Sequence, residues 1–319
     1  MRGVLTKLAS NESKHPNHAN RPKVYANIVA YEPDRGLLQD LVKSIGAQVD
    51  HVVIVNNSPQ KPVSFGSEVT VIDSPMNVGI AAAQNVAATI SIENGAEFLI
   101  QLDQDTKVPE NLVQALLASY CRMTETGARV GVVGPRWLDD DSGTEKIGIR
   151  KRMSRDHSGC RISLSVISSG SLISTEAFRE AGGFYGDLFI DYVDDEFCFR
   201  LRSLGYRIVQ DDSVSMRHSV GREYCLLGGK LRVRGHAPYR LYYLFRNLIY
   251  LQRRPYVPAS WKLSTFSRIP GRVFLNCVLL PERSKRLRYI ARGTMDGMFS
   301  RLGPLESRRS GCLGRGEQE

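Results

Sequence analysis

Short apolar runs alternate with helical patterns over the first half of the chain. Runs typical of strands cover residues 24–31, 51–55, 69–72, 98–102 and 130–133. Apolar positions at helical spacing cover residues 34–46, 80–93 and 110–120. Strands that alternate with helices are typical of βαβ units, in which helices cover a parallel sheet. The pattern therefore predicts an open, mostly parallel α/β sheet with helices on both faces.

The second half of the chain is less regular. Residues 139–161 are charged and rich in Ser and Gly, which predicts a long surface loop. Order returns over 165–218, and an aromatic, basic helix is expected over 239–250. We therefore expect a disordered leader over 1–22, an α/β domain over 23–237, a helical basic subdomain over 238–300 and a disordered tail over 301–319.

The composition is that of an ordinary globular protein, with 319 residues of which 42% are hydrophobic and 24% charged. It excludes collagen-like, largely disordered and small disulfide-rich proteins. The six cysteines lie far apart without C-x-x-C spacing, so we expect reduced thiols, no structural zinc and a cytoplasmic location. We also expect no signal peptide and no membrane span, because no apolar stretch approaches the ~18 residues that a span needs.

Polar side chains follow the predicted strands at the points where the strands end. They include Tyr31 and Glu32 after the first strand, Asn56 after the second, and Asp103 and Asp105 after the strand at 98–102. In open α/β sheets, ligands bind outside the carboxyl ends of the strands. Two carboxylates spaced two residues apart can converge there on a hard divalent cation. The alternative is a turn-forming aspartate pair that caps the next helix, but the position after an apolar strand favours the cation.

Small residues open the helix predicted at 80–93. Asn77 and Gly79 precede it, three alanines lie in its first turn, and Gln84 follows them. Small side chains would allow a nucleotide to approach the helix, and free first-turn N–H groups favour an anion. A helix packed tightly on the sheet explains the same residues equally well.

The strongest local signal is an acidic cluster directly before a helix. Asp191, Asp194, Asp195 and Glu196 lie close together, and the helix that follows ends at Gly205. Crowded carboxylates repel one another, so at least one is expected to hold its proton more tightly, which suits a general base near neutral pH. N-capping and compensation of the helix dipole explain one or two of the four acids.

His218 follows a predicted strand at 214–217, downstream of the acidic cluster. An imidazole at this strand end would complete a metal or phosphate site. A histidine satisfied by ordinary contacts is an equal alternative.

Four motifs together resemble a known family. They are N-V-G-I-A-A-A-Q-N at 77–85, L-D-Q-D-T at 102–106, S-S-G-S-L-I-S at 168–174 and F-I-D-Y-V-D-D-E-F-C-F-R-L-R at 189–202. They resemble the inverting family 2 glycosyltransferases of the GT-A fold, and more closely the bacterial rhamnosyltransferases that use dTDP-L-rhamnose. The resemblance covers residues from about 23 to 254 and implies a Rossmann-like sheet with a nucleotide sugar across its edge.

The resemblance implies a role for each candidate residue. Asp194 falls at the family's catalytic base, and Asp191, Asp195 and Glu196 would support it on the acceptor side. Asp105 and His218 would hold Mg²⁺ or Mn²⁺ on the donor diphosphate. The donor would be bordered by Tyr31, Glu32, Asn56, Asn77, Gly79, Gln84, Asp103 and Gly170. This chain departs from the broader family at Asn56, where an acid is usual.

The implied reaction is transfer of L-rhamnose from dTDP-L-rhamnose to a hydroxyl of a lipid-linked glycan or glycolipid in O-antigen or exopolysaccharide synthesis. Other dTDP- or UDP-sugars, and a rhamnolipid-type acceptor, remain open alternatives. A protein that binds a sugar nucleotide without catalysis would keep Asp103 and Asp105 but could dispense with Asp194.

The excess positive charge lies in the tail. The net charge is +10, and residues 239–319 alone carry 16 basic and 5 acidic side chains. The helix at 239–250 and the Arg-rich stretch at 283–292 would lie on the anionic inner surface of the membrane, or else form a helical subdomain packed on the sheet. Nucleic-acid binding is not expected, because no reading motif accompanies the charge and the acidic strand ends would repel phosphates.

Overall fold

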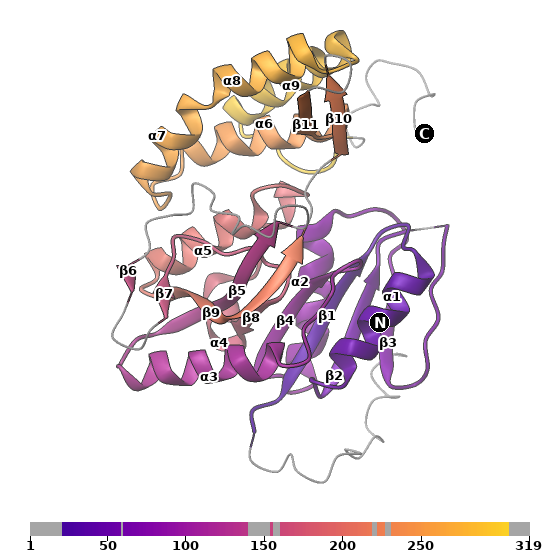
Figure 1. Cartoon of the computed structure of the whole chain (residues 1–319), viewed down its shortest axis with the longest axis vertical. Coiled ribbons are helices and arrows are strands. Elements are labelled where there is room, and N and C mark those ends of the chain that lie inside the picture. Colours follow the sequence, from indigo (N-terminus) through magenta and orange to yellow (C-terminus); the bar gives the residue numbers. More distant parts are fainter. Residues whose placement is uncertain are drawn as a thin grey trace.

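The computed structural model describes residues 21–58, 60–139, 154–155, 160–218, 222–226 and 231–305. Most of the expected leader, of the loop at 139–161 and of the expected tail lies outside these residues. Figure 1 shows a lower lobe built on a large sheet and an upper lobe made mainly of helices.

One sheet of nine strands forms the lower lobe. Its order is β3 (Val69–Asp73), β2 (His51–Asn56), β1 (Val24–Ala30), β4 (Phe98–Asp103), β8 (Ser171–Ser174), β5 (Val130–Asp139), β9 (Arg207–His218), β7 (Arg161–Ile162) and β6 (Ser154–Arg155). The first four strands of this order pair in parallel, as do β5 and β9. The expected α/β sheet is confirmed. The sequence did not predict β8, which runs antiparallel between β4 and β5.

Helices cover both faces of this sheet, as expected. The residues of α1 (Arg35–Gly46) and α3 (Leu112–Glu125) share one core with β1 and β4, and the residues of α2 (Ile80–Glu93), α4 (Thr175–Ala181) and α5 (Val193–Ser203) line the other face. In α1, Leu38, Leu41 and Ile45 are buried at helical spacing. The carboxylate of Asp34 caps this helix by accepting the N–H of Leu37 at 3.0 Å.

The upper lobe contains a hairpin and four α-helices in the described part of the chain. The hairpin is β10 (Arg222–Leu226) and β11 (Leu231–Gly235), and the helices are α6 (Pro238–Gln252), α7 (Ala259–Ser267), α8 (Ile269–Phe274) and α9 (Arg283–Met298). A π-helical turn, η3 (Leu275–Leu279), follows α8. In Figure 1, α6 lies nearer the sheet and α8 lies on the outer side of the lobe.

α6 is an internal helix. Nine of its side chains are buried, including Arg246 and Asn247, and its Leu248 and Leu251 join the core around α5. The prediction that the helix at 239–250 lies on a membrane surface is therefore wrong, and the alternative of a helix packed on the catalytic domain holds. Aromatic residues in α6 contribute apolar area to this core rather than to an interface.

The two lobes share that core. Trp261 of α7 packs edge-on against Phe199 of α5, with ring centroids 5.4 Å apart, and against Tyr192 at 5.6 Å. Residues 301–305, which the sequence assigned to a disordered tail, also pack here: the N–H of Gly303 donates to the carbonyl oxygen of Asp187 at 2.8 Å. No helix in the described part of the chain is long and apolar enough to cross a membrane.

Two glycines allow α9 to lie directly on α6. A Cβ at Gly297 would lie 2.5 Å from the carbonyl oxygen of Arg246, and one at Gly293 would overlap the carbonyl group of Tyr242. In both cases the added Cβ would clash with backbone atoms, which cannot relieve the clash by a rotamer change as a side chain could.

Gly293→Ala is therefore expected to lower the free energy of unfolding by about 1–3 kcal/mol, because α9 must move away from α6. Chemical denaturation measures the change. Gly271→Ala is the matched control, because nothing lies within 4 Å of its added Cβ. This alanine in α8 is expected to stabilise the protein by about 0.5–1 kcal/mol. Equal effects of the two substitutions would contradict the close packing of α6 and α9.

Candidate active site

The loops after β1, β2 and β4 are tied together at the carboxyl edge of the sheet. The side-chain amide of Gln104, just after β4, accepts the N–H of Tyr31 at 2.6 Å and donates to its carbonyl oxygen at 3.0 Å. The hydroxyl of Ser58, after β2, accepts the N–H of Glu32. Tyr31 and Glu32 are exposed. They therefore lie where the sequence analysis placed them, at the strand ends beside Asp103.

Three asparagines organise the next part of this edge. Asn56 is fully buried, and its amide donates to Asp73 at 2.7 Å and to the carbonyl oxygen of Lys61 at 2.9 Å. The Asn57 amide donates to the side chain of Asn77 at 2.9 Å. Asn77 is half-buried, whereas the Asn56 side chain is turned inward and committed to holding the loop. Asp73 places an exposed carboxylate beside the position where an acid was expected.

Asp103 ends β4 and is held by the turn before β8. Its N–H donates to the hydroxyl of Ser169 at 3.0 Å, and the N–H of Gly170 donates to the carbonyl oxygen of Gln101 at 2.6 Å. Gly170 has φ +75, and a Cβ there would overlap the sulfur of Met216. Only glycine adopts this conformation without strain, so it permits the close approach of the turn to β4.

Carboxylates from distant parts of the sequence converge on this point. The pKa of Asp103 is raised to about 6, first by burial and then by the negative charges of Asp105 and Asp194. A hydrogen bond from Ser169 and the charge of Arg240 act in the opposite direction. Charges interact this strongly only at short range. Asp105, which is exposed, and Asp194, at the start of α5, therefore belong to one site with Asp103.

The other acids of the 191–196 cluster have structural partners. Asp195 is buried and accepts the hydroxyl of Ser165 at 2.5 Å. Glu196 is fully buried, forms a two-pronged ion pair with Arg200 at 2.8 Å, and accepts the Tyr256 hydroxyl at 2.8 Å.

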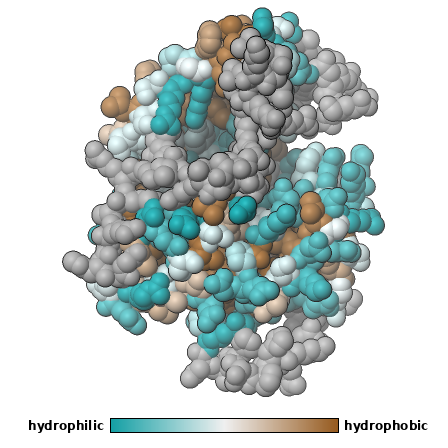
Figure 2. All heavy atoms as spheres, viewed as in Figure 1, coloured by the Kyte–Doolittle hydropathy of each residue, from teal (hydrophilic) through white to brown (hydrophobic). Residues whose placement is uncertain are grey.

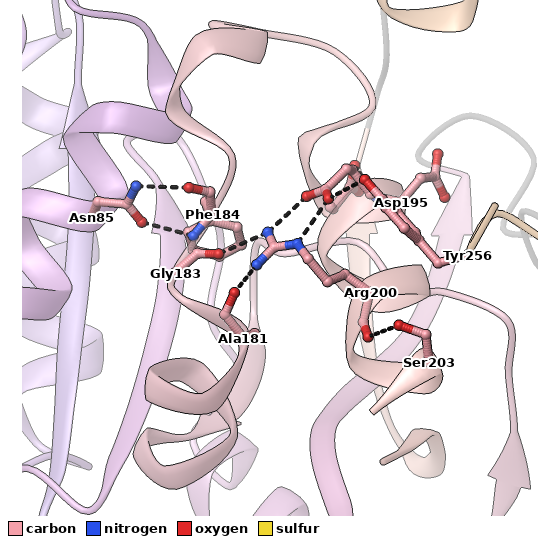
Figure 3. Close-up of polar contacts among 10 residues, drawn as sticks. Asn85, Ala181, Gly183, Phe184, Asp195, Arg200, Ser203 and Tyr256 are labelled. Atoms are coloured by element: carbon pink, nitrogen blue, oxygen red, sulfur yellow. Dashed lines mark hydrogen bonds and ion pairs between the residues drawn. The ribbon is translucent and has the colours of Figure 1, made fainter. Parts of the chain in front are cut away.

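Arg200 also contacts the segment of the chain that precedes the acidic cluster. Figure 3 shows its guanidinium reaching the carbonyl groups of Ala181 and Gly183, while Asn85 of α2 brackets the backbone of Phe184. A buried carboxylate that is paired and hydrogen-bonded in this way fixes geometry. Glu196 therefore holds the start of α5 against the preceding segment.

The segment directly before α5 has an unusual backbone. Phe189, Asp191 and Tyr192 have φ of +67, +67 and +62, although none is glycine. Non-glycine residues in such conformations cost about 1–3 kcal/mol each and persist only where surrounding contacts enforce them. We call residues 187–192 the catalytic loop, because they set the direction in which Asp194 enters the site.

α6 supplies the contacts that enforce this loop. The buried amide of Asn247 donates to the carbonyl oxygens of Leu188, Ile190 and Asp191 at 3.0, 2.8 and 2.8 Å. Arg246, also fully buried, donates to the carbonyl oxygens of Asp187 and Leu188. The ring of Phe189 stacks on Tyr243 with centroids 4.7 Å apart.

Arg240, also on α6, contacts the acidic cluster directly. It makes a two-pronged ion pair with Asp191 at 2.9–3.1 Å. Its positive charge also opposes the rise in the pKa of Asp103. His236 lies just before α6, and burial lowers its pKa. The site therefore contains a fixed cation between the loop that precedes α5 and the end of β4.

The small residues at the start of α2 face the catalytic loop. A Cβ at Gly79 would lie 2.5 Å from the ring of Phe189. The N–H groups of Ile80 and Ala81, expected to be free for an anion, donate instead to the carbonyl oxygen of Phe189. Gln84 is buried on the same helix, and its Oε1 has no hydrogen-bond partner. The alternative of a helix packed for close approach thus explains this turn.

The structure describes the side chain of only one of the two candidate metal ligands, Asp105 and His218. Asp105 is exposed beside Asp103. The backbone of His218 ends β9, opposite Asp139, but its side chain lies outside the described residues. Among the residues whose side chains are described, no group of three or more His, Cys, Asp or Glu could hold a metal ion.

Comparison with known proteins identifies the class of this chain. No protein-family model matches it. It is 29% identical to dTDP-rhamnosyl transferase RfbF of Shigella flexneri over 290 residues, which cover 86% of this chain and 95% of that protein. This similarity confirms the resemblance inferred from the motifs.

Solved structures agree on the fold. S. aureus TarS 1-349 in complex with UDP-GlcNAc has a TM-score of 0.54 at 14% identity, covering 86% of this chain and 81% of that one. GalNAc-T7 with UDP, GalNAc and Mn²⁺ also has a TM-score of 0.54, at 15% identity, covering 88% of this chain. The chain spans 56% of GalNAc-T7 and 43% of a longer TarS chain.

The chain has the GT-A fold, and its sequence is similar to that of a glycosyltransferase.

Sequence reasoning missed the residues that hold the acids of this site in place. Arg240, Arg246 and Asn247 lie far along the chain, in a helix interpreted as a membrane face. One signal was present in the sequence: an Arg-Asn pair within an otherwise apolar and aromatic helix needs hydrogen-bond partners if the helix is buried.

Asn247→Leu keeps the number and branching of the side-chain heavy atoms but removes the donors to the three loop carbonyls. We expect the kcat of glycosyl transfer to fall by about 100-fold, because a small misplacement of a reacting group costs that much, while KM for the donor stays near the wild-type value. Steady-state kinetics at saturating acceptor measure both constants.

Leu248→Ala is the matched control. It removes buried apolar volume from the next position of α6 and is expected to destabilise the protein by about 2–5 kcal/mol. Its kcat should remain near the wild-type value below the melting temperature. An Asn247→Leu enzyme with wild-type kcat would show that the catalytic loop does not depend on α6.

Proposed function

We propose that the protein is an inverting rhamnosyltransferase. It transfers L-rhamnose from dTDP-L-rhamnose to a hydroxyl of a lipid-linked glycan or glycolipid in O-antigen or exopolysaccharide synthesis. The observation that carries this proposal is the convergence of Asp103, Asp105 and Asp194 at one edge of the sheet. The relative's name, dTDP-rhamnosyl transferase, supports the donor.

Asp194 is the proposed catalytic base. Its carboxylate takes the proton of the acceptor hydroxyl as that oxygen bonds to the anomeric carbon of the sugar. The bond from the anomeric carbon to the diphosphate oxygen breaks in the same step, and its electron pair leaves with dTDP. Asp191, Asp195 and Glu196 accept hydrogen bonds from Arg240, Ser165 and Arg200, and we assign them to positioning the base.

The residues at the end of β4 fit a divalent cation, Mg²⁺ or Mn²⁺. Burial raises the pKa of Asp103 first, and the negative charges of Asp105 and Asp194 raise it further. Carboxylate oxygens are the ligands that such cations prefer. Asp105 would hold the ion, with His218 as the second proposed ligand. A bound cation supplies positive charge that offsets the charge developing on the departing diphosphate. GalNAc-T7, solved with UDP and Mn²⁺, supports this assignment.

The donor is proposed to lie along the carboxyl edge of the strands. Tyr31 and Glu32 would border the base together with the Asn56 loop, where Asp73 stands beside Asn56. Asn77 and Asp103 would contact the base, ribose or sugar. Gly79 and Gly170 would permit the close approach of the surrounding loops, and Gln84 would border the donor from α2. Nucleic acid is not a proposed partner, because the site is acidic.

A second donor remains a candidate. TarS 1-349, which shares the fold, was solved with UDP-GlcNAc, so another dTDP- or UDP-sugar is the alternative to dTDP-L-rhamnose. A rhamnolipid-type acceptor is the corresponding alternative on the acceptor side. Either lipid acceptor implies work at the cytoplasmic face of the membrane, as a peripheral protein.

Asp194→Asn removes the base while keeping the shape of the side chain. We expect transfer to fall at least about 1,000-fold, near the upper range of general-base contributions, with donor binding preserved. Asp105→Ala should instead weaken the Mn²⁺-dependent part of donor binding. The measurement is thermal unfolding with a panel of nucleotide sugars, with and without Mn²⁺, since a ligand of the native state raises the melting temperature.

This experiment tests the identity of the donor and the role of Asp194 separately. A shift with dTDP-L-rhamnose that exceeds the shift with UDP-sugars supports the assigned donor, and the reverse order assigns another one. Wild-type turnover in the Asp194→Asn enzyme would remove this residue from the mechanism. Glu176→Gln, a surface change on α4, is the control for lost carboxylates and should alter neither quantity.

A further inference from the structure

The outer side of the upper lobe carries a row of exposed apolar side chains. Along α7, α8 and η3, Leu263, Phe266, Pro270, Phe274 and Val278 recur every three or four residues, the spacing of one helix face. We call these five residues the outer stripe. Leu263, Phe266, Phe274 and Val278 are 73, 61, 56 and 45% exposed. Figure 2 shows hydrophobic residues along the outer margin of this lobe.

The opposite face of the same helices already anchors them. Trp261, Thr265 and Asn276 are buried. Thr265 accepts the side-chain amide of Gln252, and Asn276 accepts the guanidinium of Arg286. The fold therefore does not need the outer stripe to attach these helices. A surface helix normally places polar residues on its free face, so a continuous apolar row there indicates a binding surface.

The charge around the stripe is mostly positive, with Glu282 at its end as an exposed acid. Residues 224–281 contain no Asp or Glu. Arg268 is exposed between α7 and α8, and Arg283 and Arg288 are exposed on α9, which packs beside η3. Apolar side chains flanked by arginines are typical of helices that lie in the interface of an anionic bilayer.

We propose that the outer stripe docks the protein on an anionic lipid bilayer, with its apolar side chains at the acyl boundary and Arg268, Arg283 and Arg288 at the level of the lipid phosphates. The inference rests on the proposed function in one respect, because a lipid-linked acceptor presents its hydroxyl at that surface. It replaces the helix at 239–250, which is buried, as the membrane face.

The stripe is directly connected to the catalytic loop. Arg272, on the inner side of α8, donates to the hydroxyl of Tyr192 at 2.7 Å. Tyr192 is the residue before α5, two positions before Asp194. Docking through the stripe therefore fixes the height of the catalytic loop above the lipid, where the acceptor is presented.

Vesicle co-sedimentation of the full chain tests the proposal. We compare the wild type with Phe266→Gln/Phe274→Gln and with Arg268→Gln on phosphatidylglycerol-containing vesicles and on neutral phosphatidylcholine vesicles. The wild type should bind the anionic vesicles more strongly and lose binding at high salt. The double variant should partition at least about tenfold less, because it loses both aromatic anchors. Arg268→Gln should reduce binding to the anionic vesicles alone.

Val86→Gln is the matched control, because Val86 is 41% exposed on α2 in the other lobe. It should bind vesicles as the wild type does. Equal partitioning of the double variant and the wild type would overturn the proposal. So would a wild-type dimer in light scattering that the double substitution dissociates, because the stripe would then bind a second copy. The donor-induced melting shift, measured on the same samples, reports the proposed function separately and should be unchanged in every variant.

Discussion

Three non-glycine residues with left-handed backbone lie within four positions before α5, and the polar side chains of α6 hold them there. Each such residue costs about 1–3 kcal/mol, so the catalytic loop would relax without that support. Arg246 and Asn247 in turn need the loop carbonyls as partners, because both side chains are fully buried and a buried polar group without a partner costs about 1–3 kcal/mol. The loop and the helix thus satisfy each other's polar groups.

This mutual dependence explains why the helical lobe belongs to the catalytic unit. α6 presents Arg240 to Asp191, stacks Tyr243 on Phe189 and receives α9 along its two glycine contacts. Burial, together with the negative charges of acids at the end of β4 and the start of α5, raises the pKa of Asp103 to about 6. Like charges are gathered only where rigid contacts oppose their repulsion, and such sites are where ligands of opposite charge bind.

Much of the lower lobe could be predicted from the sequence, because its strands and helices carry strong periodic patterns. The position of Asp103 and Asp105 at the carboxyl edge followed from the rule that ligands bind outside the ends of parallel strands, whereas the place of Asp194 in the same site was implied by the family resemblance. The antiparallel strand β8 could not be predicted, since its four residues are buried and show no alternation. The membrane interpretation of the helix at 239–250 failed because apolar and aromatic content does not distinguish a buried helix from an interfacial one.

The sequence also did not show which acid of the 191–196 cluster has which role. Asp195 and Glu196 have the same local sequence context as Asp194, and only tertiary partners, Ser165, Arg200 and Tyr256, separate structural acids from the one that faces Asp103. Likewise, the N–H groups at the start of α2 were expected to bind an anion, but the Phe189 carbonyl reaches them because Gly79 leaves room. Apart from the Glu196–Arg200 pair, these contacts join residues 30 or more positions apart, beyond the reach of local patterns.

A crystal structure with dTDP-L-rhamnose and Mn²⁺ tests the central claim most directly. The account predicts the diphosphate and the cation beside Asp105, with the Asp194 carboxylate facing the anomeric carbon from the side opposite the diphosphate and the catalytic loop unchanged against α6. A nucleotide bound away from the carboxyl edge of the sheet, or an Asp194 carboxylate directed away from the sugar, would contradict it.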